Sequence, residues 1–316
     1  MAESTAPRRN DLTASLGRPI LVMMVYRGGA RFQRALTSLV PALDCFHRVI
    51  LSVTSAEDSE DLATARRFAA QHPGVEVLCT GQELPTMAHQ AFWIDHLEKT
   101  GVRPEDWILW LAYDDELRVR GIRSIVDDQG NWPLHAGTAY FGPWAMRHEQ
   151  ADVLWHGDPA EPLDSWTSFP LDGPLRTCVI DWIGAQLYQP TYMQMSGSVC
   201  TFDSHRSLVR GVLRKGGPMR IEMATAAALN TRFVEEFPEP ISIIYGRPNS
   251  DRASYGRAAR REDWHLLIHL LGYLFRHPGQ LPTAMRWAWR FARRSWGRGR
   301  GGAISEAWVR RTQVQP

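Results

Sequence analysis

Residues Trp107–Leu117 read WILWLAYDDEL, an apolar run that ends in three consecutive acids and a leucine. A strand that is apolar along its whole length is typical of the centre of a parallel sheet, where both faces are covered. In open α/β sheets, ligands bind just beyond the carboxyl ends of the strands. The stretch therefore predicts a central parallel strand with a ligand site at its end.

The residues before this run alternate strand-like and helix-like patterns. Strands are predicted at Ile20–Val25, Arg48–Val53 and Val75–Cys79, and helices at Ala30–Leu39, Ser59–Gln71 and Thr86–Thr100. Strand starts near residues 20, 48, 75 and 107 have the spacing of successive right-handed βαβ units. The first half thus predicts an α/β, Rossmann-like fold with a mostly parallel central sheet flanked by helices.

The second half is less regular. Strands are predicted at Thr138–Trp144, Ser198–Phe202 and Ile241–Tyr245, a helix at Arg220–Thr231, and two helical stretches from Glu262 onward, broken at His277-Pro278-Gly279. The segment Gln150–Thr177 is rich in proline, aspartate and tryptophan and has no clear period. We interpret it as a long loop that lines a site.

The composition is that of an ordinary soluble globular protein, with 316 residues of which 44% are hydrophobic and 22% are charged. The four cysteines form no C-x-x-C pair, which favours reduced thiols over disulfides or zinc ligands. Residues 1–17 are polar and predict a disordered N-terminus without a secretory signal. The apolar run Trp264–Phe275 is too short to span a bilayer. These features predict a cytoplasmic protein.

The charge is divided unevenly along the chain. After Tyr255 there are twelve arginines and three acids, which gives +9; since the whole chain carries +2, the first 255 residues carry −7. The segment Leu281–Trp296 interleaves aromatic residues with arginine, which suits a helix lying on an anionic membrane surface. A helix packed on the body with its arginines outward fits the same residues, and both interpretations stay open. The single Gly/Arg motif Arg298–Gly302 is too short to predict a nucleic-acid partner.

The adjacent acids Asp114 and Asp115 have two interpretations. Two neighbouring carboxylates at a strand end repel each other unless a cation or a hydroxyl-rich ligand lies between them. Mg²⁺ or Mn²⁺ binds such oxygens and also bridges phosphate oxygens. Alternatively, Asp114 caps a following helix, with Asp115 and Glu116 in its first turn.

The order of several segments in residues 18–255 resembles glycosyltransferase family 2, whose members have the GT-A fold. The matching segments are Ile20–Gly29 (ILVMMVYRGG), the helix Arg34–Leu39, Ile50–Leu62 (ILSVTSAEDSEDL), Tyr113–Leu117 (YDDEL), Gly197–Phe202 (GSVCTF), Arg220–Met223 (RIEM) and Ile244–Ser254 (IYGRPNSDRAS). The carboxylate motif is the most specific of them. The resemblance implies a GT-A type sheet in residues 18–255, followed by a basic amphipathic helical extension in residues 256–300 and a tail in residues 301–316.

The resemblance also implies an activity and its residues. A sugar would pass, with inversion, from a nucleotide-diphosphate sugar to the hydroxyl of a glycan or lipid-linked acceptor, as in bacterial-type polysaccharide or glycoconjugate synthesis. The residues implied to bind the donor are Tyr26, Arg27, Thr54, Ser55, Asp114 and Arg247; Asp114 and Asp115 would hold Mg²⁺ or Mn²⁺, and Glu222 would be the general base. The enzyme would be cytoplasmic and would rest on the inner membrane leaflet.

The sequence departs from the family pattern at four places. Thr54 and Ser55 stand where an acid usually ends the second strand, and Ala112 replaces the first acid of the longer carboxylate motif. Met223 replaces the aspartate of a Glu-Asp pair, and Arg247 stands where histidine is common. Glu222 is therefore the expected base, with Asp181 and Asp203 as reserves.

Two other functions fit the same residues. A nucleotidyl- or phosphosugar-transferase on a related fold would need a phosphate-binding loop, for which only Arg27–Arg31 (RGGAR) offers a weak match. A degenerate nucleotide-sugar-binding protein without activity would account for the missing acids. The oligomeric state is not predicted by the sequence.

Overall fold

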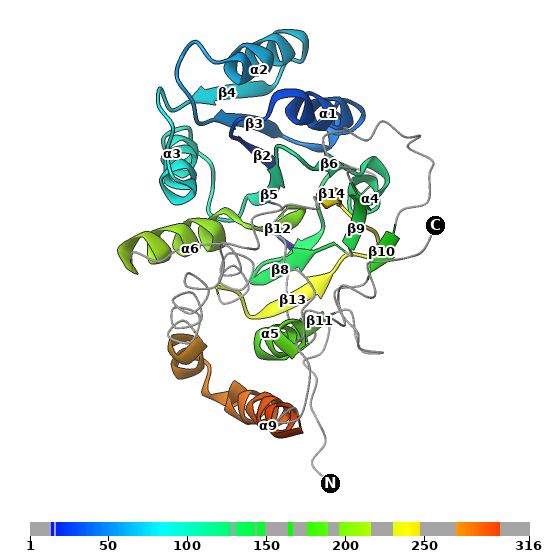
Figure 1. Cartoon of the computed structure of the whole chain (residues 1–316), viewed down its shortest axis with the longest axis vertical. Helices are drawn as coiled ribbons and strands as arrows, with labels where there is room; N and C mark the ends of the chain where they lie inside the picture. Colours follow the sequence, from blue (N-terminus) through cyan, green and yellow to red (C-terminus); the bar gives the residue numbers. More distant parts are fainter. Residues whose placement is uncertain are drawn as a thin grey trace.

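An eight-stranded mixed sheet forms the centre of the protein (Figure 1). The computed structural model describes residues 14–15, 17–127, 130–142, 144–148, 164–166, 176–188, 196–215, 230–246 and 270–297. The strand order is β11-β13-β8-β12-β5-β2-β3-β4. Strands β4, β3, β2 and β5 are mutually parallel, and β12 is antiparallel to both of its neighbours, β5 and β8.

The first half of the sheet confirms the predicted strands and helices. Its elements are β2 (Pro19–Val25), α1 (Gly29–Leu39), β3 (Arg48–Val53), α2 (Glu60–Gln71), β4 (Val75–Cys79), α3 (Thr86–Lys99) and β5 (Trp107–Ala112), with a 3-10 turn η1 (Val40–Cys45) after α1. Ser59 is the N-cap of α2, and its hydroxyl accepts the N–H of Leu62 at 3.2 Å. All residues of β2 are buried, as a central parallel strand requires.

The second half of the sheet contains elements that the sequence pattern did not predict. They are β11 (Arg176–Cys178), α5 (Val179–Tyr188), α6 (Phe202–Lys215) and β13 (Phe233–Glu236), beside the predicted strands β8 (Thr138–Phe141) and β12 (Ser198–Thr201). Strand β13 runs parallel to β8, and β11 closes the edge antiparallel to β13. This strand order, with one antiparallel strand inserted beside the parallel half, is an α/β Rossmann-like fold of GT-A type.

A second sheet of four short strands stands beside the first. Its order is β10 (Asp164–Trp166), β9 (Trp144–His148), β14 (Ser242–Gly246) and β6 (Glu116–Leu117). Strand β6 follows directly from the acids after β5, so the carboxylate turn connects the two sheets. The remaining short elements are β1 (Ala14–Ser15), which pairs with β7 (Leu134–His135), and the helix α4 (Val119–Arg123).

Three predictions for the second half are corrected. The segment Thr138–Trp144 is not one strand, because β8 ends at Phe141 and β9 begins at Trp144 in the other sheet. The segment Gln150–Thr177 is not a continuous loop, because it holds β10 and the start of β11. Phe202 begins α6 instead of ending a strand. The helix predicted at Arg220–Thr231 lies almost wholly outside the described residues, and its last residue, Thr231, is not helical.

The core has two layers because successive residues of each strand point to opposite faces of the sheet. Ile20, Val22 and Met24 of β2 belong to one apolar cluster, which α3, α5 and α6 cover. Alternate residues of the same strand belong to the other cluster, which α1 and α2 cover. The C-terminal helix α9 (Leu281–Gly297) follows a 3-10 turn η3 (Pro278–Gln280) and confirms the predicted helical extension broken near Pro278. Among the described residues, no helix is both long and apolar enough to cross a bilayer.

The amino ends of β2 and β5 are joined through one buried carboxylate, that of Asp106. Arg18 donates from its backbone N–H to Oδ1 at 2.9 Å and from its guanidinium to Oδ2 at 2.8 Å, and Arg103 adds a guanidinium bond at 3.0 Å. Burial alone would raise the pKa of Asp106, but these hydrogen bonds lower it from 3.8 to about 2. Because the folded-state pKa lies below the unfolded one, the carboxylate stabilises the fold above about pH 4, and this contribution is lost as the pH falls towards 2.

We therefore expect Asp106→Asn to lower the free energy of unfolding by about 2 kcal/mol at pH 7, which is the shift in pKa expressed as energy. The loss should shrink between about pH 4 and pH 2, where the wild-type carboxylate is itself protonated. Urea unfolding across this pH range measures both effects, with Asp95→Asn, the same chemical change at an exposed position of α3, as the control. An equal loss at pH 7 and at pH 2 would contradict the assignment.

Candidate functional site

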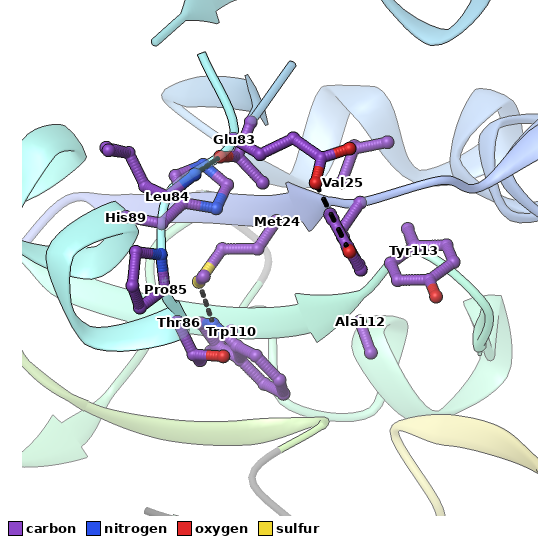
Figure 2. Close-up of a pocket in the computed structure, with 12 residues that line it drawn as sticks. Met24, Val25, Glu83, Leu84, Pro85, Thr86, His89, Trp110, Ala112 and Tyr113 are labelled. Atoms are coloured by element: carbon purple, nitrogen blue, oxygen red, sulfur yellow. Dashed lines mark hydrogen bonds between the residues drawn. The ribbon is translucent and has the colours of Figure 1, made fainter.

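A cavity of about 570 Å³ opens at the carboxyl ends of β2, β3 and β5 (Figure 2). It is lined by Met24, Val25, Tyr26, Thr54, Glu83, Leu84, Pro85, Thr86, His89, Trp110, Ala112 and Tyr113. Its size falls within the range of small-molecule sites. It lies at the sheet edge where the sequence predicted a ligand.

The carboxylate turn Tyr113–Glu116 borders this cavity. Tyr113 itself lines the cavity, and the next residue along the chain is Asp114. Asp115 is buried, and its backbone N–H donates to the carbonyl of Ala112 at 3.2 Å. The helix-cap interpretation of Asp114 is wrong, since β6 follows the turn and α4 begins only at Val119, without a side-chain cap.

The turn is held by Arg34 of α1. Its Nε lies 3.1 Å from Oε1 of Glu116, and its Nη2 donates to the backbone carbonyl of Asp114 at 3.2 Å. Its guanidinium carbon lies 3.5 Å from the ring centroid of Tyr245 in β14, and the Tyr245 hydroxyl donates to Glu116. One guanidinium thus fixes the carboxylate turn against both α1 and the small sheet.

If Asp114 and Asp115 bind the metal ion that the family resemblance implies, Arg34→Met, which removes the contacts of Arg34 with the turn, should displace the carboxylates and lower turnover by about tenfold while the cavity persists. The matched control is Gln33→Met, an exposed position on the same helix. The concentration of Mn²⁺ needed for half-maximal activity should rise in the Arg34 variant and stay unchanged in the control. A change in thermal stability without a change in Mn²⁺ dependence would assign Arg34 a purely structural role.

Of the two residues after β2, Tyr26 lines the cavity, and Arg27 forms an ion pair with Glu83, which also lines it. Arg27 donates to Glu83 from Nε at 3.0 Å and from Nη2 at 3.1 Å, and the hydroxyl of Tyr26 lies 3.4 Å from the same carboxylate. Among the described residues, Arg27 alone is a non-glycine residue with positive φ, at 50°. Such backbone outliers are concentrated at ligand sites. Glu83 was not predicted from the sequence, although it follows the end of a parallel strand, as the predicted site residues do.

Thr54 and Ser55, at the end of β3, differ in their positions. Thr54 is buried and lines the cavity; its Oγ1 accepts the N–H of Leu84 at 2.7 Å and lies 3.3 Å from the carbonyl of Gln82. It therefore holds residues 82–84 beside the cavity. Ser55 is not among the lining residues, and its hydroxyl lies 2.6 Å from that of Ser59, the N-cap of α2.

His89 is a buried polar residue of the cavity wall that the sequence did not single out. Its Nε2 lies 2.8 Å from the hydroxyl of Ser52, and burial lowers the pKa of His89 to about 4. The imidazole is therefore neutral at physiological pH. Beside it, the indole N–H of Trp110 points to the sulfur of Met24 at 3.2 Å, which gives the wall a largely apolar surface.

The glycine turn before α1 is already bound by a side chain of the protein. Asp61 of α2 accepts the backbone N–H of Gly28 at 2.7 Å and that of Gly29 at 2.9 Å. These amides form the positive end of the α1 dipole, where a phosphate would otherwise be favoured. The carboxylate of Asp61 is therefore an internal cap on the glycine turn at the start of α1.

The two reserve bases lie at the wrong end of the sheet. Asp203 begins α6 beside the start of β5, where its N–H donates to the carbonyl of Pro104 at 3.0 Å and its side chain pairs with Arg206. Asp181 lies in α5, after β11, which runs antiparallel to β13 and so ends at the amino ends of the parallel strands. Of the acids considered as bases, only Glu222 remains. Glu222 and Arg247 both lie outside the described residues.

The turn before β12 reaches the carboxylate end of β5. The hydroxyl of Ser196 accepts the N–H of Ala112 at 3.2 Å, and the N–H of Gly197 donates to the carbonyl of Trp110 at 2.8 Å. Gly197 has a φ of 80°, and a Cβ added there would lie 2.6 Å from the hydroxyl of Ser242. Glycine is thus needed for the close approach of three strands beside the acids.

Within the described ranges, no group of three or more His, Cys, Asp or Glu side chains is arranged to hold a metal ion. The adjacent carboxylates of Asp114 and Asp115 offer a smaller ligand set. Mg²⁺ is commonly bound in this way, through one or two carboxylates, with water and substrate phosphates completing its coordination. The two residues present therefore fit an ion that arrives with a phosphorylated substrate.

Comparisons with known proteins add little to this picture. No protein-family model matches the sequence, and no curated protein matches it. Among solved structures, the crystal structure of a 4-diphosphocytidyl-2C-methyl-D-erythritol synthase aligns with 77% of this chain and 98% of that chain, at 12% identity and a TM-score of 0.40. A similarity at that score supports no conclusion about activity. The α/β fold of GT-A type rests on the strand order of the chain itself, and membership of glycosyltransferase family 2 stays a prediction.

Proposed function

We propose that the protein is a glycosyltransferase that moves a sugar from a nucleotide-diphosphate sugar to an acceptor hydroxyl, with inversion and with the help of Mg²⁺ or Mn²⁺. The observation that carries the proposal is the position of Asp114 and Asp115. They follow the central strand β5 at its carboxyl end, directly after Tyr113, which lines a cavity of about 570 Å³. A nucleoside would occupy the cavity, and its diphosphate would reach the two carboxylates through a shared cation.

The cavity has surfaces that suit a nucleoside. Trp110 and Met24 give it an apolar wall, on which a base can lie, and the neutral imidazole of His89 offers a hydrogen-bonding group. Beside the cavity, Arg27 and Glu83 form an ion pair, in which the guanidinium can bind a phosphate and the carboxylate can accept a hydrogen bond from a ribose hydroxyl. These contacts agree with donor-binding roles for Tyr26 and Arg27, whereas the hydroxyl of Thr54 is engaged with residues 82–84.

In the proposed reaction, the acceptor oxygen attacks the anomeric carbon as the bond from that carbon to the diphosphate oxygen breaks. Glu222 takes the hydroxyl proton of the acceptor on the face of the sugar opposite the leaving group. Arg247 is proposed to contact the leaving diphosphate from the segment after β14. When bound, Mg²⁺ or Mn²⁺ neutralises the charge that develops on the diphosphate. The roles of Glu222 and Arg247 rest on the sequence.

The internal cap on the glycine turn weighs against a nucleotidyltransferase. Such an enzyme binds a triphosphate, and the amides of Gly28 and Gly29 are the donors that the turn after β2 could offer to it. Both amides are bound by Asp61. A diphosphate held at the carboxylate turn does not need them. The cap on the glycine amides therefore favours a nucleotide-diphosphate sugar as the donor.

The acceptor is proposed to be a glycan or lipid-linked glycan, and the enzyme to work in the cytoplasm at the inner membrane leaflet. The support is the split of charge between a body of −7 and a C-terminal region of +9. A basic region attracts an enzyme to anionic lipid, where lipid-linked acceptors are found. No nucleic-acid partner is proposed.

A thermal-shift screen tests the donor class directly, because a ligand that binds only the folded state raises the unfolding temperature by mass action. Nucleotide-diphosphate sugars with Mn²⁺ should raise it, and EDTA should abolish the shift. Slow hydrolysis of the active donor to nucleoside diphosphate and free sugar should follow. A stronger response to nucleoside triphosphates, with release of pyrophosphate from a sugar phosphate, would favour the nucleotidyltransferase. Donor binding without any turnover would favour a binding protein.

A further inference from the structure

The C-terminal helix α9 is fixed to the body along one face. The indole of Trp287 is 6% exposed, and its Nε1 donates to Asp181 at 2.9 Å; Arg286 reaches the same carboxylate at 2.8 Å. The ring lies against Gly184 of α5, where an added Cβ would lie 2.3 Å from the indole. Because Trp287 belongs to the core cluster on this side of the sheet, α9 is part of the folded body.

The opposite face of α9 carries an exposed apolar stripe formed by Leu281, Met285 and Trp289. These side chains are 50%, 64% and 65% exposed, respectively. Their spacing of four residues aligns them along one side of the helix. At about 100° per residue, Met285 and Trp289 both point away from the buried Trp287. We call this set the outer stripe.

The helix that carries the outer stripe is basic. Arg286 and Arg290 are exposed; Arg286 is paired with Asp181, and the guanidinium carbon of Arg290 lies 4.8 Å from the ring centroid of Trp287. The helix contains two further arginines, Arg293 and Arg294, and no acid over Leu281–Gly297. A large apolar residue set beside several arginines on a helix that does not span a bilayer is the pattern of a helix lying in a membrane interface.

We propose that α9 binds an anionic membrane surface through the outer stripe, with the net positive charge of the helix attracted to the lipid headgroups. Charge selects this occupant over a second copy of the chain. In a symmetric dimer, two copies of a helix that has four arginines, one of them paired with Asp181, and no acid of its own would face each other and repel. An anionic bilayer instead complements them, and each arginine near its surface contributes on the order of 1 kcal/mol. The proposed reaction supplies the reason for the location, but the binding itself does not depend on that function.

The membrane-binding face is separate from the donor cavity. The cavity lies at the carboxyl ends of β2, β3 and β5, whereas α9 packs on α5, which begins near the amino ends of the parallel strands (Figure 1). Substitutions in the outer stripe should therefore leave nucleotide binding unchanged. This separation allows membrane binding and donor binding to be tested on the same protein.

The test is flotation of the full chain with vesicles of phosphatidylcholine alone or of phosphatidylcholine with phosphatidylglycerol. At low salt the protein should float with the anionic vesicles only, and at about 1 M salt, where the Debye length is about 3 Å, it should be released. Met285→Ser with Trp289→Ser should lower the bound fraction by about tenfold, since interfacial binding scales with the apolar area inserted.

The matched control is Val40→Ser with Leu213→Ser, which removes two exposed apolar side chains from other surfaces and should leave flotation unchanged. Thermal shift by a nucleotide-diphosphate sugar is measured on each variant as a separate readout of the donor site. Wild-type protein that stays in the soluble fraction with anionic vesicles at low salt overturns the proposal. So does equal binding to neutral vesicles, or a dimer that the stripe variant dissociates without any flotation of the wild type.

Discussion

Asp115→Asn abolishes the divalent-dependent binding of nucleoside diphosphate and lowers turnover by about 10³-fold, if the carboxylate pair has the proposed role. The change removes one negative charge and one metal-binding oxygen but keeps the shape of the side chain. Because Asp115 is buried at the end of β5, a water molecule cannot take the place of the lost metal-binding oxygen.

Calorimetric titration of a nucleoside diphosphate, with Mn²⁺ and with EDTA, measures this effect. The control is Asp58→Asn, which makes the same chemical change at an exposed position after β3, a strand of the same sheet. Its binding should match the wild type in both conditions. Binding by the wild type that is indifferent to EDTA, and unchanged in the Asp115 variant, would exclude a metal role for the pair.

Glu222→Gln is the second change with a large expected effect. Loss of a general base lowers turnover by about 10²–10⁴-fold, while the affinity for the donor stays close to that of the wild type. The reason is that the base acts on the acceptor hydroxyl and not on the nucleotide. The measurement is single-turnover transfer at saturating donor, with donor affinity determined separately by thermal shift.

The structure supplies the control for this experiment. Asp203 lies beside the start of β5, at the end of the sheet away from the cavity, and forms an ion pair with Arg206. Asp203→Asn should therefore retain turnover. If Asp203→Asn and Glu222→Gln both retain it, the base is another residue, and the assignment from the family resemblance is wrong.

The first half of the fold could be predicted because each of its elements buries one regular face. Strand β2 is apolar throughout, and α1 buries Phe32, Ala35, Leu36 and Leu39 at helical spacing. The second half lacks that regularity for physical reasons. The sequence of α5, VIDWIGAQLY, is mostly apolar because the helix packs on β13 and is also covered by α9, so it shows no polar face. Strand β13 reads FVEE, and its two acids give it a polar composition that resembles that of a loop.

The site residues, too, divide into those that the sequence could predict and those that it could not. Asp114 and Asp115 could be predicted because they directly follow an apolar strand. Glu83 and Asp61 could not be assigned a role, because their partners, Arg27 and the glycine amides, are about 56 and 33 positions away in the sequence. The pairing of Arg34 with Glu116 and Tyr245 likewise joins three elements that only the fold brings together.

The docking of Trp287 into the recess at Gly184 also bears on how the protein is made. Domains generally fold from the N-terminus as the chain leaves the ribosome. Here one side of the sheet lacks a core residue until α9 has emerged, because Trp287 packs with residues of β2 and α3 in the same cluster. A nascent chain that stops short of α9 would leave Asp181 without its indole and guanidinium partners. The last step of folding is therefore expected to wait for the synthesis of residues beyond Trp287, and until then the growing protein needs protection from aggregation.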